Sequence, residues 1–132
     1  CMAAKRGVDV KIVTPFIPDK KSVFEVTRSN YQTLIESGVT VYEYTPGFIH
    51  AKSFVVDDKY AVIGTINLDY RSLYLHFECG VWIYNSKTIL DMKEDYLNTL
   101  EVCTVYTLEQ CYKVSAIKRI YRSILQIFAP LL

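Results

Sequence analysis

Two residues of one short segment are of types that could act together on a phosphate ester. His50 and Lys52 stand one residue apart in a stretch of the form H-x-K-x-x-x-x-D that ends at Asp57. We expect this stretch to be a β-strand, in which residues two apart point to the same side. An imidazole can serve as a nucleophile or an acid near neutral pH. A neighbouring ammonium can stabilise the charge that develops on a phosphate oxygen. The spacing therefore predicts a centre for attack on phosphodiesters.

Asp57 is the third member of this pattern and is counted with the catalytic candidates. Its odd spacing from His50 and Lys52 places it on the other side of an ideal strand. It also begins the Asp-Asp-Lys sequence of a predicted turn. These two features favour a role in bracing the loop over contact with substrate.

A second group of polar residues follows the first. Gly64-Thr-Ile-Asn67 begins fourteen residues after His50, and Glu78 heads a later predicted strand. Asn67 could orient phosphate oxygens, and Thr65 could fix the loop or hold a carboxylate. A carboxylate at Glu78 could accept a hydrogen bond from a histidine ring and set its tautomer. Asn67 and Glu78 are therefore further catalytic candidates, and Thr65, Asn67 and Lys52 are candidates for substrate binding.

Arg71 is the remaining candidate for substrate binding, because a guanidinium can bind a phosphate through two hydrogen bonds. The alternative is that residues 69–72 form a salt-bridged loop near the mouth of the site. The other histidine, His76, has no such pattern around it, and we interpret it as structural or peripheral.

Taken together, these residues resemble the HKD motif of the phospholipase D superfamily, in which a Gly-Ser/Thr-x-Asn segment and a later glutamate follow the H-x-K-x-x-x-x-D sequence. The matching residues here are His50, Lys52, Asp57, Gly64, Thr65, Asn67 and Glu78. The segments 4–10, 47–52, 67–73, 77–78 and 128–132 are similar to the second motif half of bacterial cardiolipin synthases.

The resemblance implies a phospholipase D-like half-domain that acts as a phosphatidyltransferase. Such an enzyme transfers a phosphatidyl group between two phosphatidylglycerol molecules through a phosphohistidine intermediate, without a metal or an organic cofactor. Its partners would be phosphatidylglycerol, anionic membrane lipid, and either a missing N-terminal HKD half or a second copy in a homodimer. The catalytic domain would face the cytoplasm at the cell membrane, with membrane helices upstream. Whether His50 is nucleophile or general acid and base stays open.

Two other functions are compatible with the same residues. Water as the acceptor would give a phospholipase or a nuclease that builds its site by dimerisation. A chain with one HKD motif could also be an inactive half-site. The formal net charge of +1 provides no broad positive field, so nucleic acid is not an expected partner. The four cysteines have no zinc-type spacing, so no metal site is expected.

The elements that must position these residues alternate between strand and helix. Strands are expected at 8–13, 39–44, 48–56, 60–63 and 78–84, and helices after an Asp19 cap up to Gly38 and from Ser86 to about 102. This order predicts an α/β fold with a mixed β-sheet flanked by helices. Residues 1–132 are expected to form one domain. Because the chain opens like the last turn of a helix, we expect a fragment of a longer protein with two HKD motifs.

Residues 108–132 are predicted to form an amphipathic C-terminal helix. One face carries Ile117, Ile120, Tyr121, Ile124 and Phe128, and the opposite face carries Ser115, Arg119, Arg122 and Gln126. This helix could pack on the sheet as an ordinary surface helix. It could also lie on an anionic membrane with its basic face toward the headgroups.

Overall fold

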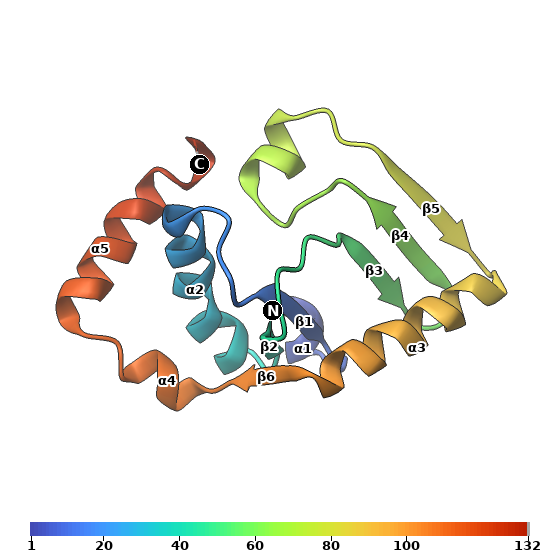
Figure 1. The fold of residues 1–132 in the computed structure, drawn as a ribbon, viewed down its shortest axis with the longest axis horizontal. Helices are drawn as coiled ribbons and strands as arrows, with labels where there is room; N and C mark the ends of the chain where they lie inside the picture. Colours follow the sequence, from blue (N-terminus) through green and yellow to red (C-terminus); the bar gives the residue numbers. More distant parts are fainter. Residues whose placement is uncertain (132) are drawn as a thin grey trace. The chain divides into compact units, whose positions relative to one another are not determined.

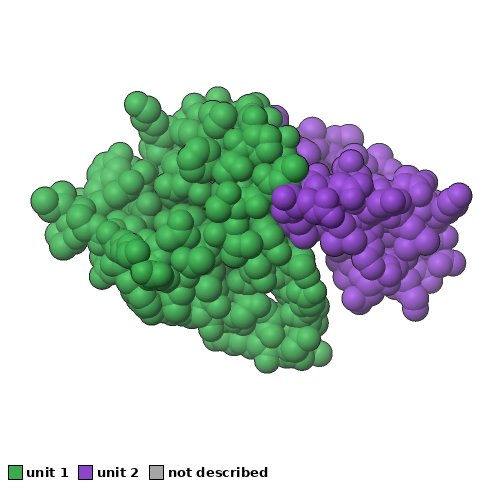
Figure 2. Space-filling model, turned by 60° about the horizontal axis from the view of Figure 1, so that its bottom comes forward, with its two compact units in different colours: residues 1–49, 102–132 green, residues 50–101 purple. Residues whose placement is uncertain are grey.

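The chain divides into two compact units, each built around its own three-stranded sheet. The computed structural model describes residues 1–131. Residues 1–49 and 102–132 make the first unit and residues 50–101 the second (Figure 2). The predicted α/β class is confirmed, but the strands form two sheets where one was expected.

The sheet of the first unit is mixed, as predicted. Its strands are β1 (Lys11–Pro15), β2 (Thr40–Tyr44) and β6 (Cys103–Tyr106), in the order β1-β2-β6. β1 runs parallel to β2, and β6 runs antiparallel to it. The sequence did not predict β6, which follows directly after a helix and supplies the third strand (Figure 1).

The first unit also holds the helices α1 (Met2–Lys5), α2 (Lys21–Glu36), α4 (Leu108–Tyr112) and α5 (Ala116–Ile127) and the 3-10 turn η2 (Ala129–Leu131). Gly38 follows α2 with φ of +93°, a conformation that favours glycine, which confirms the predicted helix end. The helix start differs from the expectation. Lys20 holds the capping position and no side chain caps it, so Asp19 does not have the predicted role.

The core of the first unit lies between α2, β2 and α4. Tyr31, Val39, Val41 and Cys111 are buried together. The Tyr31 hydroxyl meets Oγ1 of Thr14 at 2.6 Å and donates to the Glu43 carboxylate over 3.2 Å. This satisfies a polar group that would otherwise be costly to bury.

The second unit is an antiparallel sheet with one long helix. Its strands are β3 (Ser53–Val56), β4 (Tyr60–Gly64) and β5 (Gly80–Tyr84), in that order. The π-helical turn η1 (Arg71–Leu75) joins β4 to β5, and α3 (Lys87–Glu101) follows. The Ser86 hydroxyl accepts from the Thr88 amide over 3.3 Å, which agrees with the predicted start of this helix.

The strand expected at 48–56 is shorter in the structure. Residues 50–52 are irregular, and β3 begins at Ser53. The first bond of the ladder joins the Gly64 amide to the Lys52 carbonyl over 3.1 Å. The paired register of β3 and β4 begins at Ser53 and Ile63, so His50 lies outside the regular strand.

The segment predicted to form one C-terminal helix contains two helices, and the polar side of the second one packs inward. α4 ends at Tyr112, and α5 begins after Ser115, whose hydroxyl accepts from the Lys118 amide. α5 lies beside α2 with its polar side toward it (Figure 1). Six large apolar side chains of the helix region are half or more exposed: Ile117, Ile120, Ile124, Ile127, Phe128 and Leu131. Arg122 is 8% exposed, so a basic face turned toward headgroups does not fit this packing.

None of the helices in residues 1–131 has both the length and the apolar character needed to cross a bilayer.

Candidate active site

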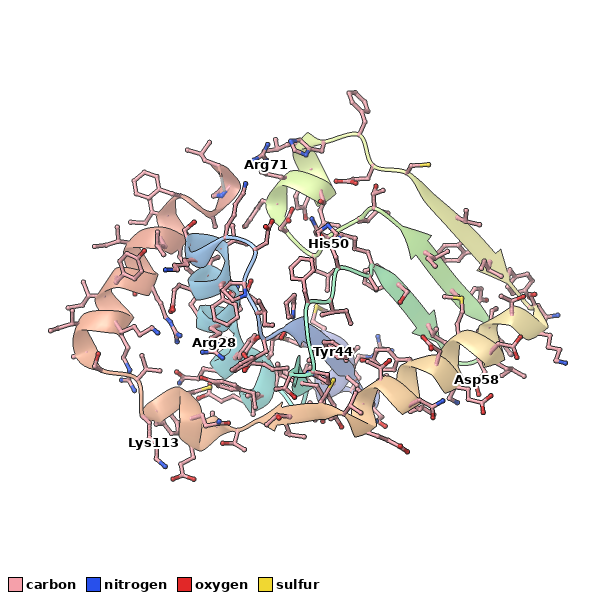
Figure 3. The ribbon with its side chains drawn as sticks, viewed as in Figure 1. Arg28, Tyr44, His50, Asp58, Arg71 and Lys113 are labelled. Atoms are coloured by element: carbon pink, nitrogen blue, oxygen red, sulfur yellow. The ribbon has the colours of Figure 1, made fainter. Side chains whose placement is uncertain are left out.

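His50 and Lys52 lie just before β3, where the hairpin opens (Figure 3). The Lys52 ammonium donates to the His50 carbonyl over 2.7 Å, so the lysine side chain folds back along its own segment. His50 is exposed and Lys52 is half-buried. The expectation that a regular strand positions the two side chains is wrong for these residues. A local hydrogen bond joins them in its place.

Thr65 links the end of β4 to the approach of β5. Its amide donates to the Cys79 carbonyl over 2.9 Å, and its hydroxyl accepts from the Cys79 amide over 3.1 Å. The same hydroxyl donates to the Glu78 carboxylate. The predicted role of Thr65 in holding a carboxylate is therefore seen in the structure.

Gly64 makes this junction possible. A Cβ atom at this position would lie 2.2 Å from the Cys79 carbonyl oxygen and 2.6 Å from the Gly80 Cα. Both obstacles are backbone atoms that cannot move aside without separating β4 from β5. The glycine of the motif is thus required by the close approach of two strands.

Glu78 is the site residue whose charge is most affected by its neighbours. The hydrogen bond from Thr65 is the main reason that the pKa of Glu78 lies below its ordinary value, and Ser72 contributes in the same direction. Electrostatic interactions with His76 and Lys52 also lower the pKa of Glu78. The carboxylate is therefore ionised at neutral pH, with Lys52 within its electrostatic reach.

Arg71 and His76 form a pair that the sequence did not reveal. Nη2 of Arg71 lies 3.0 Å from Nε2 of His76, and Nε of Arg71 donates to the same ring nitrogen over 3.3 Å. His76 is exposed, which agrees with the peripheral position that was one of the two expectations and not with a packed structural role. The π-helical turn brings these residues together, and no spacing rule for α-helix or strand indicates such a contact. Just before this turn, the Asp69 carboxylate accepts a hydrogen bond from the Ser72 amide over 2.7 Å.

Two candidates, Asp57 and Asn67, have no hydrogen bond to another candidate residue within 1–131. Asp57 lies in the β3–β4 turn with φ of +50°, next to Asp58, which is bonded to Lys93. Five residues of extended chain from Lys52 correspond to about 16 Å. Figure 3 shows Asp58 of this turn far from His50 along the hairpin. Asp57 therefore shapes the turn. Asn67 is exposed, and no hydrogen bond joins it to any residue within 1–131.

The second unit thus holds the imidazole of His50, the cations of Lys52 and Arg71, and the ionised carboxylate of Glu78. No cluster of three or more His, Cys, Asp or Glu side chains suited to a metal ion occurs in the described part of the chain. Such a set can bind an anionic ester and move a proton to or from it.

The chain matches the model of a PLD-like domain, and its fold agrees with that of a solved phospholipid-synthesising enzyme. The solved structure of a phosphatidylserine synthase from Haemophilus influenzae has the same fold, with a TM-score of 0.66 and 22% sequence identity. The similarity covers 98% of this chain and 35% of that chain.

The sequence family is more specific. The family model described as "Cardiolipin synthase, PLD-like domain" matches residues 1–100, and the chain belongs to this family. A cardiolipin synthase of Clostridium perfringens is 42% identical over 131 residues, and one of Halalkalibacterium halodurans is 40% identical. An uncharacterized protein of Streptococcus mutans is 46% identical over 130 residues. These alignments cover 98–99% of this chain but only 26–28% of the relatives.

Proposed function

We propose that this chain supplies one half of the active site of a cardiolipin synthase-type phosphatidyltransferase. The observation that carries the proposal is the set of His50, Lys52, Thr65 and Glu78, which lie in one compact unit of a chain that belongs to the cardiolipin synthase family. The substrates proposed are two phosphatidylglycerol molecules, and the products are cardiolipin and glycerol. The catalytic domain is proposed to act at the cytoplasmic face of the cell membrane.

The proposed reaction has two displacements at phosphorus. In the first, one imidazole attacks the phosphodiester, the bond to the glycerol headgroup breaks, and a second imidazole protonates the departing oxygen. In the second, that imidazole takes the proton from a hydroxyl of another phosphatidylglycerol. The hydroxyl oxygen attacks the phosphohistidine and frees the histidine. Atoms balance over the cycle, and neither a metal nor an organic cofactor takes part.

His50 supplies one of these imidazoles in the proposal. Lys52 is proposed to stabilise a non-bridging phosphate oxygen, and Arg71 and Asn67 are proposed to bind the headgroup region. Glu78, held by Thr65, orients an imidazole and balances its charge in the cationic form. Asp57 contributes only to the hairpin.

The second imidazole is proposed to come from another HKD half. Because the chain spans about a quarter of the length of its curated relatives, such a half could belong to a longer protein or to a second copy of this chain. A single copy with one motif is expected to have weak activity or none.

The test is replacement of His50 in a protein that carries both HKD halves. His50→Gln is expected to abolish the conversion of labelled phosphatidylglycerol to cardiolipin. Thin-layer chromatography of the lipid products measures this conversion. Its matched comparison is His76→Gln, which changes the other histidine of the chain and is expected to leave turnover measurable. Substantial cardiolipin formation by His50→Gln would contradict the proposal. Phosphatidic acid as the main product would identify water as the acceptor and a phospholipase in place of a transferase.

A further inference from the structure

A cavity of about 350 Å³ lies in the first unit, among α2, α4 and α5. Its lining includes three arginines, Arg28 from α2 and Arg119 and Arg122 from α5, together with Ser29 and Gln126. No aspartate or glutamate is among the described residues that line it. None of the candidate active-site residues contributes to this cavity, since they belong to the second unit.

Arg122 shows that the cavity offers unused donors. This residue is 8% exposed, and its one side-chain hydrogen bond within residues 1–131 runs from Nε to Glu25 over 2.8 Å. A guanidinium has five N–H donors, so its two terminal nitrogens remain available. No side-chain nitrogen in the described chain is both fully buried and without a partner, so these two nitrogens keep some access to solvent. Arg122 is among the residues that line the cavity.

The other two arginines are held in place by the fold. Arg28 donates from Nε and Nη2 to the two Glu43 oxygens at 2.8 and 2.7 Å, and its guanidinium lies 4.4 Å from the Phe24 ring centroid. Arg119 donates from Nη2 to the Tyr112 carbonyl over 3.1 Å. Side chains that are already fixed lose little entropy when they bind a ligand.

The local charge balance favours an anion. Glu25 is shared between Lys118 at 2.9 Å and Arg122 at 2.8 Å, so one carboxylate faces two cations. Glu43 balances Arg28, whereas the only described partner of the Arg119 guanidinium is a neutral carbonyl. Glu36, near the α4 end, is bonded to Gln32 and Tyr112 and does not line the cavity.

From these observations we infer that the cavity between α2 and α5 is a second ligand site, which binds the phosphate group of a mono- or diester. Planar guanidinium groups pair well with tetrahedral oxyanions, which present several acceptor oxygens at once. The volume admits a phosphate with a small polyol, such as a glycerophosphate. The source is either a soluble phosphate ester or the headgroup of a phospholipid. This site shares no residue with the proposed transferase site.

The experiment measures binding of sn-glycerol 3-phosphate to the 132-residue chain by calorimetry, at constant ionic strength adjusted with sodium chloride. Arg119→Gln is the test variant, because its side chain is exposed and makes one described contact. Loss of a charge-assisted hydrogen bond predicts binding weaker by about tenfold. Arg6→Gln, an exposed arginine at the end of α1, is the matched control and is expected to bind like the original chain.

Arg71→Gln separates this site from the candidate active site. Weaker binding in Arg71→Gln together with unchanged binding in Arg119→Gln would overturn the inference, as would no binding by the original chain. Co-sedimentation with phosphatidylglycerol vesicles distinguishes the two sources. Vesicle binding that is lost in Arg119→Gln identifies a lipid headgroup, and glycerophosphate binding without Arg119-dependent vesicle binding identifies a soluble ester. Circular dichroism confirms that the variants are folded.

Discussion

The hydroxyl of Thr65, at the end of β4, donates its hydrogen to the carboxylate of Glu78, at the approach to β5. A hydrogen bond to the charged form of an acid favours ionisation, and this bond is the largest contribution to the lowered pKa of Glu78. The same Thr65 hydroxyl thus bonds the Cys79 amide at the β4–β5 junction and keeps the Glu78 carboxylate ionised.

Removal of that hydroxyl is expected to raise the pKa of Glu78 toward its ordinary value. Thr65→Val keeps the shape of the side chain and deletes the donor, whereas Thr65→Ser keeps the donor and is the control. A carbon-detected NMR titration of the Glu78 carboxyl group measures the change. An equal pKa in both variants would show that Thr65 is not the main cause.

Gly64→Ala is expected to destabilise the chain by about 3 kcal/mol, at the upper end for overpacking, because the new methyl group meets backbone atoms of Cys79 and Gly80. Gly47→Ala is the matched control, since no atom lies within 4 Å of a Cβ there. Urea denaturation of both variants gives the free energies of unfolding. Similar values for the two would mean that β4 and β5 can separate at little cost.

Glu43→Ala should cost about 3–5 kcal/mol of stability, because it leaves the Arg28 guanidinium without its bidentate partner in a largely buried place. The Glu43 side chain is only 6% exposed. Glu109→Ala breaks the exposed pair with Lys113 and is expected to change stability by less than about 1 kcal/mol. Chemical denaturation compares the free energies of unfolding of the two variants. A small loss of stability in Glu43→Ala would show that the buried Arg28–Glu43 pair contributes little.

Acid should weaken the attachment of α5 to α2. Burial alone would raise the pKa of Glu25, but hydrogen bonds from Lys118 and Arg122 outweigh it and hold the pKa below its ordinary value. A carboxylate with a lowered pKa in the folded state stabilises the fold above its unfolded pKa, and this contribution is lost as the pH falls through the folded value.

The stability difference between the original chain and Glu25→Gln is therefore expected to be full at pH 6 and to shrink as the pH drops below about 4.5, the ordinary glutamate value. Urea midpoints at several pH values between 6 and 3 measure it. A difference that does not change over this range would rule out Glu25 as the titrating group.

Local signals in the sequence were sufficient where a single residue determines the backbone. Gly38 ends α2, and Ser86 starts α3, as their residue types predict. One of the two roles expected for Thr65, holding a carboxylate, is seen in its bond to Glu78, but the sequence did not indicate which carboxylate it would hold.

Other features depend on tertiary structure, which no local pattern contains. β6 has only four residues and follows α3 without a glycine or proline, so it resembles the end of a helix until β2 pairs with it. The Arg71–His76 contact arises from a π-helical turn, which standard periodicities do not describe. Lys118 and Arg122 of α5 form ion pairs with Glu25 of α2, so this side of α5 faces α2. Because Glu25 is distant in the sequence, the helical pattern of residues 116–127 does not indicate this orientation.

The attachment of α5 by charged and amide groups gives this helix an unusual response to solution conditions. Contacts between apolar side chains weaken on cooling and are strengthened by salts such as sulfate. The Glu25 ion pairs respond in the opposite sense to salt, because mobile ions screen them where they are open to solvent. A buffer rich in sodium chloride should thus loosen the C-terminal helix first, while the β1-β2-β6 sheet of the same unit stays intact.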